Sequence, residues 1–408
     1  MKKTLVAIAA LAATGAFAQS SVVIDGYFDR AYTSVNNTNN NLDAKSVGSN
    51  AGTTTIGFKV REDLGGGMSV GGSVNTDWTD LGGAQQKDNI GTAQRDGFAN
   101  SQSFLDVTSA KYGTVRFGSV NSFTLTNATA VTSPAYSTAI GSSYSSNFSI
   151  VNGLGTAKSD NTGIVNASAD IKNSAGTAQT GVTAGQRSIR FANTLQYSSP
   201  VFLGGLSAHV AYAPQNDNDT GAATAATYNA AASNATTAVK AYGNTVGMKE
   251  YALRYTQGPL DAMFTSIKYS VGSNIVGAGA SVSATAFAAG LTSTQNLLGA
   301  TYQVMPALKL HAGYGTFSSS NDAYKGKSQQ IGATYTTGAW DILGQMAKVD
   351  DQSTNDADRK LTGLGVNYNL SKTARVYVRY DSINYASNKA AFEGSEQKRY
   401  ALGVSKAF

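Results

Sequence analysis

The sequence predicts an all-β protein, a 16-stranded antiparallel β-barrel that spans a membrane. Stretches of about ten residues that alternate in polarity recur along the chain, joined by connections that are short at one end and long at the other. No apolar segment is long enough to cross a bilayer as a helix. In the last strand, Tyr400, Leu402, Val404 and Phe408 share one face, opposite small residues. This pattern suits a wall between lipid and a polar interior.

The first 18 residues resemble an export signal. Lys2 and Lys3 form a basic start, an apolar stretch follows, and Ala16-Phe17-Ala18 is typical of a cleavage site. We therefore expect residues 1–18 to be removed and residues 19–408 to form a single barrel domain. Loss of the two lysines leaves 29 basic and 25 acidic residues, which lowers the formal charge from +6 to +4. This balance is too small to indicate a nucleic-acid partner.

The composition favours extended structure without covalent cross-links. The chain has no cysteine, so disulfides and thiol chemistry are excluded, and another device must hold the fold together. A closed hydrogen-bonded sheet is such a device. The 44 glycines, 21 tyrosines and 15 phenylalanines, with only 5 prolines, are typical of tightly packed strands that carry aromatic anchors.

Alternation and turn residues place the strands in order along the chain. The sixteen expected strands are residues 22–33, 53–61, 68–78, 98–109, 114–119, 187–198, 206–212, 248–256, 260–270, 295–304, 308–317, 328–336, 340–349, 360–370, 374–384 and 397–408. Tight turns are expected at 62–67, 111–113 and 199–200, and long loops at 119–186 and 214–246. An even number suits a bacterial single-chain barrel, and sixteen strands leave a water-filled lumen.

The same alternation assigns charged residues to a face of the wall. In residues 53–61, Ile56, Phe58 and Val60 would meet lipid, so the basic residues between and beside them would point inward. Similarly, Phe191, Leu195 and Tyr197 outward would turn Arg190 inward. Lumen-facing basic residues assigned in this way are Lys59, Arg61, Arg116, Arg190, Arg254, Arg375 and Arg379; lumen-facing acidic residues are Asp25, Asp29, Asp77, Glu250 and Asp381. Since basic rings favour anions, we expect weak anion selectivity.

Arg30 differs from these residues, because alternation sends it outward with Phe28 and Tyr32. A subunit contact or a place at the rim of the barrel suits it better than the lumen.

Nothing in the sequence indicates catalysis. A Ser-His hydrolase needs a placed histidine with an orienting partner, and only His209 and His311 are present, both inside alternating strands. The chain has no histidine pair at metal-ligand spacing, no calcium-loop pattern and no phosphate-binding glycine loop before a helix. We therefore expect neither an enzyme, nor a metal site, nor a cofactor.

Four motifs resemble the general porins of Gram-negative bacteria, especially the betaproteobacterial type. Residues 54–65, TTIGFKVREDLG, resemble the second strand and first turn of that family, and residues 113–118, GTVRFG, resemble the strand that enters its constriction loop. Residues 190–200, RFANTLQYSSP, resemble the strand that leaves this loop. The terminal Phe408 matches the family's ending. The four motifs occur in the family's order, and with the strand rhythm the likeness spans the whole mature chain.

The resemblance implies a homotrimer in the cell outer membrane, in contact with lipid and lipopolysaccharide, that passes small hydrophilic solutes and ions by diffusion. It also implies that the third outer loop, residues 119–186, folds inward as a constriction or cap, and that Phe408 serves as a signal to the barrel-assembly machinery. The chain departs from the family where arginines often stand, at Thr55 and Ser119. Part of the basic ladder is therefore missing.

Two other functions keep the barrel but change its use. One is a substrate-specific channel, because selectivity depends on where the long loop packs. The other is a plugged barrel that acts as an adhesin or receptor through its long loops, of which 119–186 and 214–246 are candidates.

Overall fold

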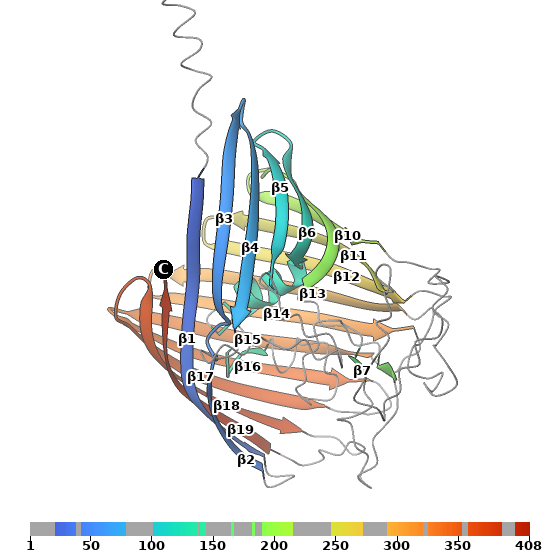
Figure 1. The fold of residues 1–408 in the computed structure, drawn as a ribbon. Coiled ribbons are helices and arrows are strands. Elements are labelled where there is room, and N and C mark those ends of the chain that lie inside the picture. Colours follow the sequence, from blue (N-terminus) through green and yellow to red (C-terminus); the bar gives the residue numbers. More distant parts are fainter. Residues whose placement is uncertain are drawn as a thin grey trace, which may run out of the picture.

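A computed structural model describes residues 21–37, 42–78, 101–134, 136–137, 139–143, 165–166, 182–183, 190–214, 246–271, 292–320, 325–352, 358–385 and 396–408. The expected export signal and most of the two long loops lie outside these residues. Figure 1 shows the strands arranged in a ring.

One antiparallel sheet contains nearly all of the described strands. Its members are β1 (Ser21–Asn37), β2 (Leu42–Gly48), β3 (Thr54–Gly65), β4 (Met68–Trp78), β5 (Ser103–Ser109), β6 (Gly113–Asn121), β9 (Arg190–Ser198), β10 (Leu206–Ala213), β11 (Val246–Gln257), β12 (Leu260–Val271), β13 (Thr292–Met305), β14 (Leu308–Ser319), β15 (Lys325–Thr337), β16 (Trp340–Asp351), β17 (Arg359–Asn369), β18 (Ala374–Tyr385) and β19 (Glu396–Ala407). A separate short pair consists of β7 (Val165–Asn166) and β8 (Val182–Thr183).

The sheet closes on itself because its first and last strands pair. Strand β1 runs antiparallel to β19, from Tyr27 opposite Ala407 to Asn37 opposite Gln397. On its other side β1 pairs with β3 over its first half and with β2 over its second half. Strands β2 and β3 thus share one place in the ring, and the 17-stranded sheet forms a closed barrel of sixteen positions. The predicted fold class is confirmed.

Strand β2 was not expected from the sequence. Its residues, LDAKSVG, do not alternate clearly between apolar and polar. They form a strand because β1 extends far enough to offer them a partner, with Ala31 opposite Gly48. Pairing with the preceding strand, which the polarity pattern of residues 42–48 does not report, decides this element.

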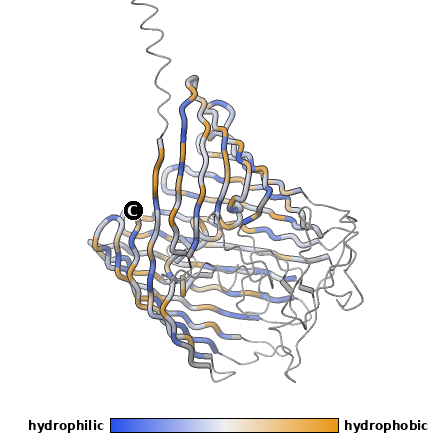
Figure 2. Tube along the Cα trace, in the orientation of Figure 1, coloured by the Kyte–Doolittle hydropathy of each residue, from blue (hydrophilic) through white to orange (hydrophobic). Residues whose placement is uncertain are grey.

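The two faces of the wall follow the predicted alternation. Figure 2 shows hydrophobic and hydrophilic residues following one another along the strands. The apolar side chains that point away from the lumen are exposed on every side of the barrel, among them Phe58, Leu253, Leu298, Ile342 and Leu402. In a bilayer this face is covered by hydrocarbon, so its exposure here marks the lipid-facing surface.

Glycines form the predicted tight turn between β3 and β4. Gly65, Gly66 and Gly67 have φ angles of 78°, 62° and 76°. Three consecutive residues in this left-handed region would be costly for side chains with a Cβ. The turn can therefore be short, and β4 returns directly along β3, with Asp63 opposite Ser69.

After β6 the chain turns into the ring instead of away from it. The helix α2 (Phe123–Thr126) leads into a π-helical turn, η1 (Asn127–Thr132), and Figure 1 shows this stretch inside the ring of strands. Ser122 caps α2 by accepting a hydrogen bond from the Leu125 amide, 2.9 Å away. Among the described residues, no helix is both long enough and apolar enough to cross a membrane.

Leu298 lies halfway along β13 on the lipid-facing surface. Replacing it with arginine should lower the free energy of unfolding in lipid vesicles by about 2–4 kcal/mol, because a guanidinium is poorly solvated at the bilayer midplane. Val304→Arg, on the same face near the tight turn, should cost at most about 1 kcal/mol. Urea titration of both variants measures the difference, and equal losses would argue against this placement of the wall in the membrane.

Candidate functional site

Two basic residues of β3 project from the face opposite Phe58 and Val60. The Lys59 Nζ atom lies 2.5 Å from Asp25 Oδ2 on β1, and both side chains remain accessible to water. Arg61 is close to the tight turn, donates to Ser69 Oγ at 2.7 Å and lies 3.0 Å from Asp106 Oδ1. The inner wall near the short turns therefore carries charges that are in contact with water.

Asp106 on β5 serves two arginines at once. Its Oδ1 meets Arg61, and its Oδ2 lies 3.5 Å from Arg116 Nη2 on β6. The carboxylate is almost fully buried, whereas Arg61 and Arg116 retain 48% and 33% of their side-chain exposure. The Arg116 guanidinium also sits 4.0 Å above the Phe104 ring, a favourable cation–π geometry. Two guanidinium groups that face water thus share one buried carboxylate.

Sequence reasoning missed Asp106. Its strand alternates, with Leu105 and Val107 exposed to lipid, so the same parity rule would have placed Asp106 inward. Gly71 on β4 leaves the space for this triad, because a Cβ there would lie 2.9 Å from Arg61 Nη2.

Other predicted charges form one-to-one pairs. Arg190 Nη2 lies 3.6 Å from Asp77 Oδ2, and its Nε donates to Asn121 Oδ1 at 3.0 Å. Arg254 makes a bidentate contact with Asp261, at 2.8 and 2.6 Å. The sequence analysis did not single out Asp261, which directly follows the β11–β12 turn. These pairs are locally neutral.

The two arginines of β18 contact neutral groups. Arg375 donates to Ser405 Oγ at 3.2 Å and to the Tyr27 hydroxyl at 3.5 Å. Arg379 is buried, donates to Asn367 Oδ1 at 2.6 Å, and lies 5.1 and 5.7 Å from the rings of Tyr377 and Tyr136.

Three of the predicted acidic residues are fully covered, and each accepts several hydrogen bonds. Asp29 accepts from the Ala51 and Asn50 amides and from the Tyr377 hydroxyl, at 2.8 Å for Ala51 and 2.7 Å for Tyr377. Glu250 accepts from the amides of Phe123 and Thr124, at 3.0 and 2.6 Å. These carboxylates hold backbone in place and do not face water.

Glu250 is hydrogen-bonded to one end of a segment inside the barrel. We call the described residues between 122 and 143 the inner segment. Besides the two amides, it accepts a hydrogen bond from the Thr124 hydroxyl at 2.7 Å. The free amides at the start of α2 thereby find a negatively charged partner on the wall. Farther along, Asn127 Nδ2 donates to the carbonyls of Met263 and Leu297, both at 2.9 Å. The segment is thus tied to β11, β12 and β13.

The other end of the inner segment is fastened across the lumen. The Gly141 amide donates to Asp381 Oδ2 at 2.8 Å, and Arg399 holds that carboxylate from β19 at 2.8 and 2.5 Å. Gln345 on β16 accepts from the Ser133 hydroxyl at 2.8 Å and donates to the Gly141 carbonyl at 2.9 Å. Burial raises the pKa of the Tyr136 phenol, which lies in this stretch.

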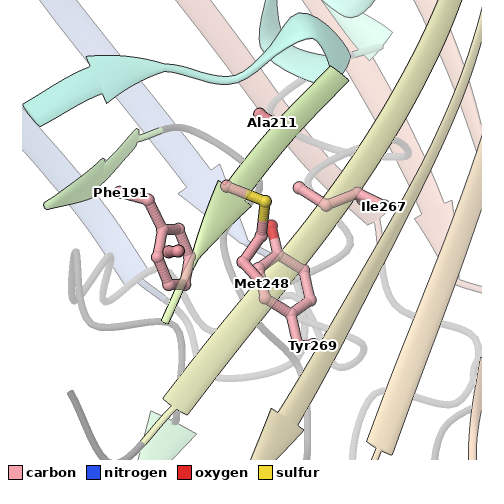
Figure 3. Packing of buried hydrophobic residues seen from close by; sticks show 6 residues of the cluster. Phe191, Ala211, Met248, Ile267 and Tyr269 are labelled. Carbon is pink, nitrogen blue, oxygen red and sulfur yellow. The ribbon is translucent and has the colours of Figure 1, made fainter. Parts of the chain in front are cut away.

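An apolar cluster seals the inner segment against the wall. Figure 3 shows Phe191, Met248, Ile267 and Tyr269 packed together beside Ala211, and Phe123 of α2 packs against this cluster. The outward placement predicted for Phe191 is wrong, since its side chain is 8% exposed and stacks on Tyr269 at 5.4 Å. A bulge causes the change: the β6–β9 register shifts between Gly118 and Val120, and Asn193 has a φ of 54°.

Both histidines belong to the wall. His311 Nδ1 lies 2.9 Å from the Thr132 carbonyl, so it ties η1 to β14. His209 Nε2 lies 3.0 Å from Ser207 Oγ, a Ser-His contact that the sequence analysis did not anticipate. Within the described residues the other ring nitrogen, Nδ1, is buried and has no hydrogen-bond partner. Among the described residues, no acceptor orients this ring in the way that the third member of a hydrolytic triad does.

Comparisons with known proteins identify relatives of this chain. A family model described as Gram-negative porin matches residues 4–388. An anion-selective porin from Comamonas acidovorans has a similar structure, with a TM-score of 0.65 and 19% identity over 96% of this chain and 100% of the other. A loop L8 deletion mutant of OmpT from Vibrio cholerae has a TM-score of 0.60 and 13% identity, over 95% of this chain and 99% of the other. OmpF of Salmonella typhi, in complex with daunomycin, has a TM-score of 0.54 and 14% identity, over 95% of this chain and 97% of the other. A search of curated proteins finds no significant match.

Glu250→Ala should loosen the inner segment while the barrel stays closed. Two buried amides and a hydroxyl lose their acceptor, so local opening should become easier by about 1–3 kcal/mol. Hydrogen–deuterium exchange of Phe123 and Thr124 measures this change. Asp261→Asn is the matched control, because it weakens a pair that does not touch the segment. Unchanged protection in Glu250→Ala would rule out the anchor.

Proposed function

The chain belongs to the Gram-negative porin family, and from this premise we propose that its pore is weakly selective for anions. A member of this family is a channel in the outer membrane through which solutes diffuse passively. Porins act as channels and not as enzymes. We also propose which residues line the pore and which partners the protein binds. Each of these proposals rests on the contacts described above.

The observation that supports a preference for anions is that Arg61 and Arg116 share the carboxylate of Asp106. Arg61 and Arg116 both face water and both contact this one buried acid, so their triad keeps a positive charge. The nearby Lys59–Asp25, Arg190–Asp77 and Arg254–Asp261 pairs add no net charge. A fixed positive charge beside a narrow water path attracts anions and repels cations.

Two of the predicted lining acids, Asp29 and Glu250, do not offset this charge at the water surface. Asp29 and Glu250 are fully buried and are bound by amide and hydroxyl donors. Arg375 remains partly exposed, donates to the neutral hydroxyls of Ser405 and Tyr27, and interacts electrostatically with Asp341 on β16. With the exception of the buried Arg379, we propose that the basic members of the predicted lining set border the water path, with Asp25 and Asp77 as the partners of Lys59 and Arg190.

We further propose that the inner segment narrows the pore to admit only small hydrophilic solutes. Its two anchors, Glu250 and Asp381, belong to strands on different sides of the ring, so the segment crosses the lumen between them.

A homotrimer is supported by Arg30 on the outer face of β1. Its Nη1 donates to Ser49 Oγ at 3.0 Å and Thr54 Oγ1 at 2.9 Å, beside the gap between β2 and β3. A guanidinium at this height, opposite Val404, is poorly suited to lipid. A second copy of the chain would cover it.

The remaining partners follow from the membrane setting. We propose contact with outer-membrane lipid and lipopolysaccharide along the exposed apolar wall. Phe408 stacks on Phe28 with ring centroids 5.3 Å apart and stays half exposed. It is therefore available to the barrel-assembly machinery until the sheet closes.

Single-channel recording in a planar bilayer under a salt gradient tests the selectivity. The wild-type reversal potential should favour the anion, and Arg61→Gln with Arg116→Gln should move it toward equal permeability, because the surplus charge is lost. Arg254→Gln with Asp261→Asn is the control: it removes a neutral pair, so the potential should stay unchanged. Cation preference in the wild type would refute the proposal. Silence from folded, inserted protein would favour a plugged barrel that acts through its loops.

Arg30→Ala should lower the temperature at which the assembled protein dissociates into folded monomers, because the intersubunit contact loses its polar centre. Gel mobility after stepwise heating reports this temperature. Phe264→Ala, on β12 across the ring, removes a comparable amount of outer surface and should leave the dissociation temperature unchanged. Equal behaviour of the two variants would place the subunit contact elsewhere.

A further inference from the structure

A short link between β2 and β3, residues 49–53, contacts both faces of the barrel wall. Figure 1 shows β2 and β3 one after the other alongside β1, which pairs with β3 as far as Tyr27 and with β2 from Ala31 onward. Asp29 and Arg30 lie between these two stretches, so on this side of β1 they meet the link instead of a paired strand. Because neighbouring residues of a strand point to opposite faces, Asp29 points into the barrel and Arg30 points out of it.

On the outer side, Arg30 holds the two ends of the link. Its Nη1 atom donates to Oγ of Ser49, the first residue of the link, and to Oγ1 of Thr54, which directly follows the link, at 3.0 and 2.9 Å. The same atom donates to the Asp29 carbonyl at 2.7 Å, and the Thr54 hydroxyl donates to that carbonyl at 3.1 Å. The guanidinium thus gathers both ends of the link around one carbonyl of β1.

On the lumen side, the Asp29 carboxylate holds the middle of the link. Its Oδ2 atom accepts from the amides of Asn50 and Ala51, at 2.8 Å for Ala51. The Tyr377 hydroxyl donates to Asp29 Oδ1 at 2.7 Å and accepts from the Ala51 amide at 3.3 Å. Asp29 is fully buried, so water does not compete for these hydrogen bonds. The link is therefore held from both faces of the wall.

The link in turn holds the tip of the inner segment, by which we mean residues 139–141. The Ile140 amide donates to Asn50 Oδ1 at 3.1 Å. Because a buried backbone amide needs an acceptor, the place of Asn50 constrains the place of this amide. The side chains of Ile140 and of Ala51 in the link also belong to one buried apolar cluster with Ala31, Tyr377 and Ala401. The tip is thus attached to the part of the wall that lies behind the outward-facing Arg30.

We propose that Asn50 positions the tip of the inner segment in the pore, and that subunit contact at Arg30 stabilises this position through the link. In the assembled protein the neighbouring subunit covers the guanidinium, which stays on Ser49 and Thr54. In a separated subunit lipid tails would surround this side chain, and a long basic side chain then turns toward the headgroups. The two ends of the link lose their shared donor, so Asn50 is held less firmly.

Subunit contact and pore width are coupled in this arrangement. The inference rests on the subunit contact and on the narrowing of the pore proposed above, and it adds the residues that connect them. Because such coupling is reciprocal, a change that frees the tip must also weaken the subunit contact. The fully narrowed pore is then a property of the assembled protein.

Hydrogen–deuterium exchange of the Ile140 amide in the assembled protein tests the positioning role. In Asn50→Ala this amide loses its acceptor, so its exchange should become about fivefold faster or more. The Phe123 amide, which Glu250 holds at the other end of the inner segment, should exchange at the wild-type rate. Thr33→Ala is the matched control, because it removes a side-chain contact between β1 and β2 that touches neither the link nor the tip. Unchanged exchange of Ile140 in Asn50→Ala would overturn the proposal.

The size dependence of solute entry is a readout that a general loss of stability does not change. A displaced tip widens the pore, so in Asn50→Ala the rate at which raffinose enters liposomes should rise severalfold relative to the rate for arabinose. A variant that merely folds less well lowers both rates and keeps their ratio. A wild-type ratio in folded, inserted Asn50→Ala would show that Asn50 does not position the tip.

A double-mutant cycle tests the dependence on subunit contact. Arg30→Ala should speed the exchange of Ile140 in the wild-type background and add little in the Asn50→Ala background, because the path through the link is already broken there. By reciprocity, Asn50→Ala should lower the temperature at which the assembled protein dissociates. Additive effects of the two substitutions, or equal acceleration at Phe123, would contradict the coupling.

The failure of this inference is distinguishable from the failure of the proposed function. An error in the proposed selectivity would appear in the wild-type reversal potential. An error in the proposed subunit contact would appear as an unchanged dissociation temperature of Arg30→Ala. Faster exchange of Ile140 in Arg30→Ala together with that unchanged temperature would overturn the dependence on assembly.

Discussion

The closure of the sheet between β1 and β19 is the constraint on which the whole molecule depends. Hydrocarbon offers no hydrogen-bond partner to a backbone amide, so a sheet that crosses a membrane can leave no open edge. Here the first strand pairs with the last along eleven positions, from Tyr27 to Asn37, and the Gly26 and Phe408 backbones exchange hydrogen bonds at 3.2 and 3.1 Å. A chain without cysteine is held together by this ring of hydrogen bonds.

Closure also creates the interior in which the charged residues have different roles. Near the short turns, Lys59, Arg61 and Arg116 stay in contact with water. At mid-height the carboxylates of Glu250 and Asp381 are covered and act on the backbone of the inner segment. The two groups thus differ in solvent access as well as in the sign of the charge that their side chains can carry.

The outer face separates its polar groups by height. Apolar side chains cover the middle of the wall, Arg30 interrupts them beside the gap between β2 and β3, and two opposed pairs of lysines, Lys249 with Lys268 and Lys348 with Lys360, stand toward the loop ends. Each of these polar groups departs from an otherwise apolar face, and lipid tails solvate a charge poorly. An exposed charge on this wall therefore indicates a position at which something other than lipid tails is the suitable neighbour.

The sequence by itself determined the features that repeat with a period of two. Alternation of residues such as Phe58, Lys59 and Val60 located the strands, gave sixteen ring positions and directed basic side chains inward, because adjacent side chains in a strand must point to opposite faces. Only the tertiary structure decided what this period does not encode. A bulge turned Phe191 into the lumen, the reach of β1 made a strand of residues 42–48, and the inner segment covered Glu250 and Asp381. Glu250 and Asp381 bind backbone amides more than a hundred residues away in the chain. Strand periodicity, in contrast, is a property of neighbours in the chain.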